Sequence, residues 1–111
     1  MDLVSSALGA NSTSNVWECA TGGMLVHIGG TFSAQTVTLQ MSPTSKTGTF
    51  ADYAVKNSAG TLTTQTFTAA ETVCYLASGQ FFRATVSNGG SPSISIYVSA
   101  LDSKSKVEVK D

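Results

Sequence analysis

The side chains that could do chemistry are few in this chain, and they stand far apart. The only histidine is His27, inside an apolar stretch, and the two cysteines are Cys19 and Cys74. A structural zinc site needs four ligands at recognisable spacings, which these three residues do not have. Nucleophilic catalysis beside His27 would need a signature such as Gly-x-Ser-x-Gly, and the sequence contains none. We therefore expect no enzyme, no metal and no cofactor, and we interpret His27 as an outward-facing or hydrogen-bonded strand residue.

The carboxylates add little to this picture. Asp52 and Glu71 are the only acids well inside the expected β region. Glycoside hydrolysis uses a pair of carboxylates, but Asp52 lies near Lys56 in sequence, so a solvated ion pair is the simpler interpretation. The glycines occur at turns rather than in a phosphate-binding Gly-x-Gly-x-x-Gly loop, and there is no acid-rich calcium loop. Nucleotide and calcium chemistry are therefore not expected.

The composition favours one folded domain with little charge. Of the 111 residues, 41% are hydrophobic and 12% are charged, and the formal net charge is −1. This length suffices for one core, and outside its last eight residues the chain lacks the cluster of cations that binding to a phosphate backbone requires. Its apolar runs are far shorter than the ~20 residues that cross a bilayer, and its N-terminus does not resemble a signal peptide. We expect synthesis in the cytosol, no nucleic-acid or membrane partner, and cysteines that are buried thiols rather than a disulfide.

Alternation of apolar and polar residues predicts β-strands. Turn residues recur at intervals of roughly 8 to 12 residues, and no stretch offers a convincing amphipathic helix. The clearest alternation puts Ile94, Ile96 and Val98 on one face. The predicted fold class is all-β, a single antiparallel β-sandwich, Ig-like or jelly-roll-like, of about seven to eight strands. The strands are expected near residues 24–28, 37–41, 51–55, 61–67 (an edge or intersubunit strand), 73–77, 81–86 and 93–99.

The N-terminal segment differs from the middle of the chain. Residues 1–15 are mostly small or polar, and Leu3, Val4 and Leu8 are their large apolar side chains apart from the initiator methionine. We interpret this segment as an extended N-terminal arm, with a frayed terminus as the alternative. The β-sandwich domain would then span residues 16–101.

The C-terminal segment, residues 102–111, alternates in charge. If it is extended, Val107 and Val109 lie on one face of it. Such a segment could pair with a strand of a neighbouring molecule, or it could be a solvated tail. We treat it as a charged C-terminal tail in which both valines are candidate interface residues.

Three aromatic side chains are candidates for a binding surface. Trp17 lies at the start of the expected domain, whereas Phe81 and Tyr97 lie opposite the apolar stripes of their strands. Exposed aromatic rings can stack on sugars, but an apolar patch made by Phe81 and Tyr97 is more typical of a protein interface. We therefore favour contact between subunits over sugar binding.

Three segments together resemble a known family. Residues 35–43 read Gln-Thr-Val-Thr-Leu-Gln-Met-Ser-Pro, residues 79–89 read Gly-Gln-Phe-Phe-Arg-Ala-Thr-Val-Ser-Asn-Gly, and residues 93–98 read Ser-Ile-Ser-Ile-Tyr-Val. A turn and the aromatic residues Phe50 and Tyr53 come between the first and the second. In order and residue type, over about residues 30–100, the chain resembles the small β-sandwich virion proteins of tailed bacteriophages.

The resemblance implies a non-enzymatic structural protein of the virion. The expected role is that of a capsid decoration, or cement, protein, with a head-fibre or tail component as the alternative. Its expected partners are the major capsid protein and further copies of itself, as a homo-oligomer that we expect to be a trimer on the capsid surface. The resemblance also implies that Leu3, Val4 and Leu8 in the arm contact capsid subunits or a neighbouring protomer. The protein would be made in the host cytoplasm. A carbohydrate-binding module or a small hydrolase would need, respectively, an exposed aromatic platform or a nucleophile beside His27.

Overall fold

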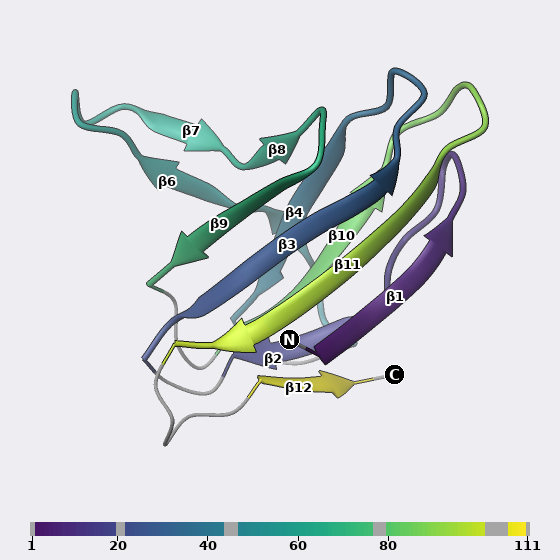
Figure 1. Cartoon of the computed structure of the whole chain (residues 1–111). Helices are drawn as coiled ribbons and strands as arrows, with labels where there is room; N and C mark the ends of the chain where they lie inside the picture. Colours follow the sequence, from purple (N-terminus) through teal and green to yellow (C-terminus); the bar gives the residue numbers. More distant parts are fainter. Residues whose placement is uncertain (1, 20–21, 44–46, 77–79, 102–106, 111) are drawn as a thin grey trace.

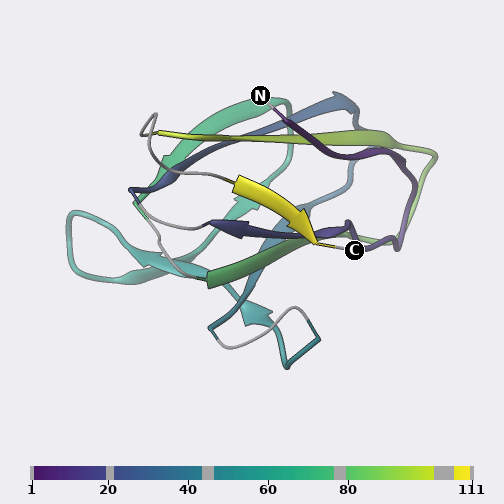
Figure 2. The same ribbon diagram turned by 90° about the horizontal axis from the view of Figure 1, so that it is seen from below.

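Every regular element among the described residues is a β-strand. The computed structural model describes residues 2–19, 22–43, 47–76, 80–101 and 107–110. Two antiparallel sheets face each other, as Figures 1 and 2 show from two directions, which confirms the predicted all-β sandwich. The strands are β1 (Asp2–Leu8), β2 (Val16–Cys19), β3 (Met24–Thr31), β4 (Val37–Ser42), β5 (Ala51–Asp52), β6 (Ala54–Lys56), β7 (Leu62–Thr64), β8 (Thr66–Phe67), β9 (Glu71–Tyr75), β10 (Gln80–Val86), β11 (Ser93–Ala100) and β12 (Val107–Lys110).

The order of these strands is that of a jelly roll. The four-stranded sheet has the order β1-β11-β3-β9. In the larger, six-stranded sheet, β2, β10, β4 and β8 are neighbours in that order, β12 is added beside β2, and β5 also pairs with β4. Most connections carry the chain from one sheet to the other, which is how a jelly roll differs from a sandwich with Ig-like topology. Both sheets are thus built from strands that are distant in sequence.

The core between the sheets explains the alternation in the sequence. Val26 in β3 and Ile96 in β11 are fully buried, and the residues on either side of each face outward. From the larger sheet, Trp17 stacks on Phe82 with ring centroids 5.9 Å apart. Each fully buried aliphatic or phenylalanine side chain stabilises the fold by about 1.5–3 kcal/mol. The two inward stripes therefore hold the sheets together.

The N-terminal segment is part of the sandwich. β1 runs antiparallel to β11 at the edge of the four-stranded sheet, and Val4 is buried in the core. Asn15 ties this strand to the rest of the fold, because its side-chain amide donates to the Val4 carbonyl (3.0 Å) and its backbone N–H donates to the Ser5 hydroxyl (2.9 Å). The expected arm over residues 1–15 is therefore corrected for residues 2–8. The neighbours of Val4 in the sequence are mostly small or polar, so the alternation that predicts a strand is absent although Val4 fills a core position.

The C-terminal segment also contributes a strand. β12 runs antiparallel to β2 at the edge of the larger sheet, where the ladder places Val107 opposite Cys19 and Val109 opposite Trp17. The strand pairing that was considered for a neighbouring molecule is found here within one chain, so residues 107–110 form an edge strand instead of the expected tail. The remaining residues of the expected tail, like Ala77 at the end of an expected strand, lie outside the described residues.

A hairpin of β6 and β7 projects from one end of the sandwich, and Figures 1 and 2 both show it reaching away from the two sheets. Its tip is ordered by Asn57, whose side-chain oxygen accepts hydrogen bonds from the N–H groups of Ala59 (2.9 Å) and Thr61 (3.1 Å). The strands expected over residues 51–55 and 61–67 are each divided in two, because their outer parts form this hairpin and their inner parts pair with β4. The second was rightly expected at an edge.

Two tyrosines at the base of the hairpin make the stability of the protein depend on pH. Burial raises the pKa of the Tyr75 and Tyr53 phenols, and Tyr75 also donates a hydrogen bond to the Gln65 side chain (2.9 Å). The unfolded chain ionises its tyrosines near pH 10, whereas the folded chain keeps these two neutral to higher pH. Their contribution to stability is thus complete below about pH 10 and is lost as the pH rises further.

We therefore expect the urea midpoint to fall as the pH rises above about 10. The Tyr75→Phe variant should lose about 1 kcal/mol at neutral pH, because it lacks the hydrogen bond to Gln65. Above pH 10 its midpoint should fall less steeply than that of the unchanged protein. Equal slopes for the two proteins would contradict this assignment.

Candidate functional site

The outer face of the four-stranded sheet carries almost no charge. Its four strands contain two charged residues, Asp2 and Glu71, which begin the two edge strands. The water-facing side of a sheet in a soluble protein ordinarily carries many charged side chains. This surface is therefore our candidate site. We name it the uncharged face, and its side chains include Leu3, Leu25, His27, Thr72, Cys74 and Tyr97.

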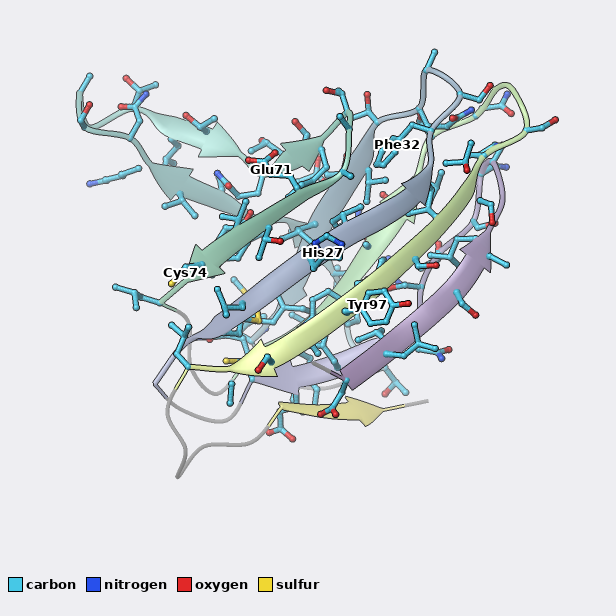
Figure 3. The ribbon with its side chains drawn as sticks, in the orientation of Figure 1. His27, Phe32, Glu71, Cys74 and Tyr97 are labelled. Atoms are coloured by element: carbon cyan, nitrogen blue, oxygen red, sulfur yellow. The ribbon has the colours of Figure 1, made fainter. Side chains whose placement is uncertain are left out.

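A row of four side chains crosses the uncharged face from edge to edge. The ladder pairs Leu3 with Tyr97, Tyr97 with His27, and His27 with Thr72. Residues paired in this way lie on the same face of a sheet with Cβ atoms about 4.5–5.5 Å apart. The rings of Tyr97 and His27 have centroids 6.0 Å apart and are tilted by 42°. Figure 3 shows the two residues on neighbouring strands. The row forms a continuous band of contact surface.

His27 is held close to the sheet from two sides. Its Nδ1 lies 2.7 Å from the Thr72 hydroxyl oxygen, and the tautomer of the imidazole decides which of the two donates. On the other side, the ring reaches over Gly29, where an added Cβ would lie only 2.9 Å from Nε2. This confirms the interpretation of His27 as a hydrogen-bonded, outward-facing strand residue. It also keeps the middle of the face flat.

Leucine side chains extend the apolar surface to one end of the sheet. Leu25 stands opposite Cys74 in the ladder, next to the row. Leu76 and Leu101 follow directly after β9 and β11, and their exposed fractions are 87% and 38%. Between them lies Gly23, with a φ of 89°, where an added Cβ would come within 2.9 Å of the Leu101 side chain. Exposed apolar side chains thus gather at this end of the uncharged face.

The outer face of the larger sheet is different, because charged side chains there are engaged in polar contacts. Nε of Arg83 donates to the side-chain oxygen of Gln40 (2.8 Å), and the Gln40 amide donates to the Asp52 carboxylate (3.1 Å). The Arg83 guanidinium also lies 4.3 Å from the centroid of the Phe50 ring. Glu71, which was considered together with Asp52 as a catalytic pair of carboxylates, belongs to the other sheet. The two carboxylates therefore do not share a site.

Phe81 and Tyr97 do not form one patch. Phe81 belongs to β10 in the larger sheet and Tyr97 to β11 in the four-stranded sheet, and each is turned away from the core. The sandwich itself therefore separates them. Trp17, the third aromatic candidate, is completely buried. The expected patch of Phe81 and Tyr97 is therefore corrected. Alternation shows which side of its own strand a residue faces, but it does not show which sheet that strand joins.

The other expected interface residues are spread over the fold. Leu3 is about half exposed and lies on the uncharged face, whereas Val4 is buried and Leu8 packs against the core. Val107 and Val109 lie in β12, at the edge of the other sheet. Three leucines and Cys74, which lie on or beside the uncharged face, are not among the expected interface residues. The alternation over residues 24–28 could have identified Leu25, since its neighbours on both sides are apolar and buried.

The two cysteines have different environments. Neither is in a disulfide, which confirms the expectation of thiols. Cys19 is buried in β2, and burial raises the pKa of its thiol, although a backbone hydrogen bond from Gly23 acts in the opposite direction. Cys74 is exposed on the uncharged face, so the expectation that both thiols are buried is corrected. Figure 3 shows Cys74 on β9, one strand away from His27.

Comparison with protein-family models, with curated proteins and with solved structures finds no match. In the part of the chain that the structure describes, no helix is long and apolar enough to cross a membrane, and no three His, Cys, Asp or Glu side chains gather as a metal site. What the uncharged face offers is a surface of aromatic, aliphatic and small polar side chains on a four-stranded sheet. Such a surface is suited to contact with another protein.

Proposed function

We propose that the chain is a structural, non-catalytic virion protein of a tailed bacteriophage. In this proposal it is a decoration protein that binds the major capsid protein on the outside of the head as a homo-oligomer and stabilises the shell. The sequence resemblance supports the family, and the uncharged face is the observation that carries an assembly role. An exposed sheet face almost without charge is typical of a surface that other proteins cover.

A decoration protein stabilises its shell through many weak contacts acting together. Each copy contributes modest binding energy, and a homo-oligomer multiplies it because several copies engage neighbouring capsid subunits at once. A sandwich whose core is filled by both sheets suits this role, since a rigid body loses little conformational freedom on binding. Synthesis in the host cytoplasm and localisation on the capsid surface belong to the same proposal.

The test uses heads of the phage that encodes the chain, prepared without this protein. Purified protein is expected to cosediment with these heads, to saturate at a fixed number of copies per shell, and to raise the temperature at which the heads release their DNA. Heads of an unrelated phage are the control. Absence of cosedimentation with the cognate heads would contradict the proposal. Immunogold labelling of the virion distinguishes the head surface from a head fibre or the tail.

A further inference from the structure

We propose that the uncharged face is the contact between two copies of this chain, related by a twofold axis. The two four-stranded sheets would stack face to face at about the 10 Å separation of packed sheets. The proposal deepens the proposed function by naming the partner of this face, but it concerns the free protein in solution and can be tested without a virion. An isologous pair holds two copies, where the resemblance led us to expect three.

The distribution of charge favours this occupant. A twofold contact brings the same surface of both copies together, so any charge near its centre would meet its own copy or be buried without a partner. The uncharged face avoids this, because Asp2 and Glu71 stand on its two edge strands and the inner strands β3 and β11 carry no charged residue. The outer face of the larger sheet, with Arg83 and Asp52, does not meet this condition.

The two halves of the face differ in the size of their side chains. One half carries bulky side chains, among them Tyr97 and Leu25. The other half carries small side chains on β11, Ser93 and Ser95, whereas the His27 ring covers Gly29 opposite Ser95 on β3. A twofold axis that lies between the two sheets and runs across the strands places the bulky half of each copy over these serines of the other. Bulky side chains would then fill space above small ones, which close packing at an interface requires.

The area agrees with a reversible pair. Four strands of seven to eight residues, or five in β9, make a face about 19 Å wide and about 25 Å long. Each copy would therefore bury roughly 500 Å² and the pair roughly 1,000 Å², at the lower limit of specific interfaces. We accordingly expect pairing that depends on protein concentration rather than an obligate dimer.

Light scattering on two matched variants tests the proposal. The unchanged protein is expected to approach twice its 11.4 kDa monomer mass at high concentration and to return to the monomer on dilution. Tyr97→Glu should weaken pairing at least about 30-fold, because it buries a charge without a partner. Phe81→Glu makes the same change on the outer face of the larger sheet and should leave pairing unchanged. A monomer at all concentrations, a trimer, or loss of pairing only in Phe81→Glu would overturn the proposal.

The exposed thiol gives a second measurement that needs no variant. Cys74 lies on the uncharged face, and Cys19 is buried, so a thiol reagent should modify Cys74 first. Where about 80% of the copies are paired, the rate of modification should fall about fivefold relative to dilute protein. A rate per thiol that is independent of protein concentration would overturn the proposal even if a variant failed to fold.

Failure of this inference and failure of the proposed function give different results. If Tyr97→Glu keeps the doubled mass but no longer binds phage heads, the uncharged face binds the shell, so the inference fails and the proposed function stands. If the unchanged protein doubles its mass but does not cosediment with heads, the inference stands and the proposed function fails. If Tyr97→Glu is monomeric and still binds heads, though more weakly, both stand.

Discussion

Replacing Trp17 with alanine is expected to lower the free energy of unfolding by about 3 to 5 kcal/mol. Trp17 is the largest fully buried side chain, it stacks on Phe82, and its indole N–H points at the sulfur of Met24, 3.3 Å away. Alanine would leave a cavity between the two sheets. Because domains of this size have a total stability of about 5–15 kcal/mol, the variant should lie near the limit of folding.

Urea unfolding followed by circular dichroism measures this effect, since the variant loses the only tryptophan as a fluorescent probe. Trp17→Phe is the matched control, because it keeps a ring against Phe82 and should lose a smaller amount. An alanine variant that unfolds within 1 kcal/mol of the unchanged protein would contradict the assignment of Trp17 to the centre of the core.

Removing residues 2–8 is expected to have a still larger effect. The deletion takes β1 from the edge of the four-stranded sheet, removes Val4 from the core and leaves one side of β11 without a partner. The burial of Val4 and the ladder hydrogen bonds together contribute at least about 4 kcal/mol. The shortened chain should unfold without a cooperative transition, or collect in the insoluble fraction because a long apolar strand has become an edge.

Leu3→Ala is the control for this deletion. Leu3 is exposed on β1, so truncating it should change the unfolding midpoint little. If the shortened chain instead unfolds with the same midpoint as the complete one, residues 2–8 form an arm that the sandwich does not need. The comparison therefore separates a strand from an arm by stability alone.

Period-two patterns predicted the strands that have one face in the core. The alternation in β10 and β11 was sufficient because every second residue is buried there. β1 was missed because its register shifts twice along β11, between Leu3 and Ser5 and between Ser5 and Leu8, so its apolar residues do not alternate. A local alternation pattern does not predict a strand that pairs irregularly with a partner far along the chain.

The candidate site was predictable only in part. Tyr97 was correctly predicted to face away from the core, and His27 was correctly interpreted as an outward-facing residue. Their joining with Thr72 into one row depends on which strands become neighbours, and β3, β9 and β11 are far apart in sequence. Leu76 and Leu101 follow the ends of strands, where alternation no longer reports exposure. Non-local pairing therefore created the face, and a single sequence does not display it.

The pairing of β1 with β11 also sets when the protein can fold. β1 finds its partner in residues 93–100, so it has nothing to pair with until that distant segment has been synthesised. Domains dominated by such distant contacts fold slowly, over milliseconds to seconds. Until β11 has been made, the apolar strands of the nascent chain stay exposed to one another and to other chains. The yield of soluble protein should therefore depend on how well aggregation of its incomplete chains is prevented.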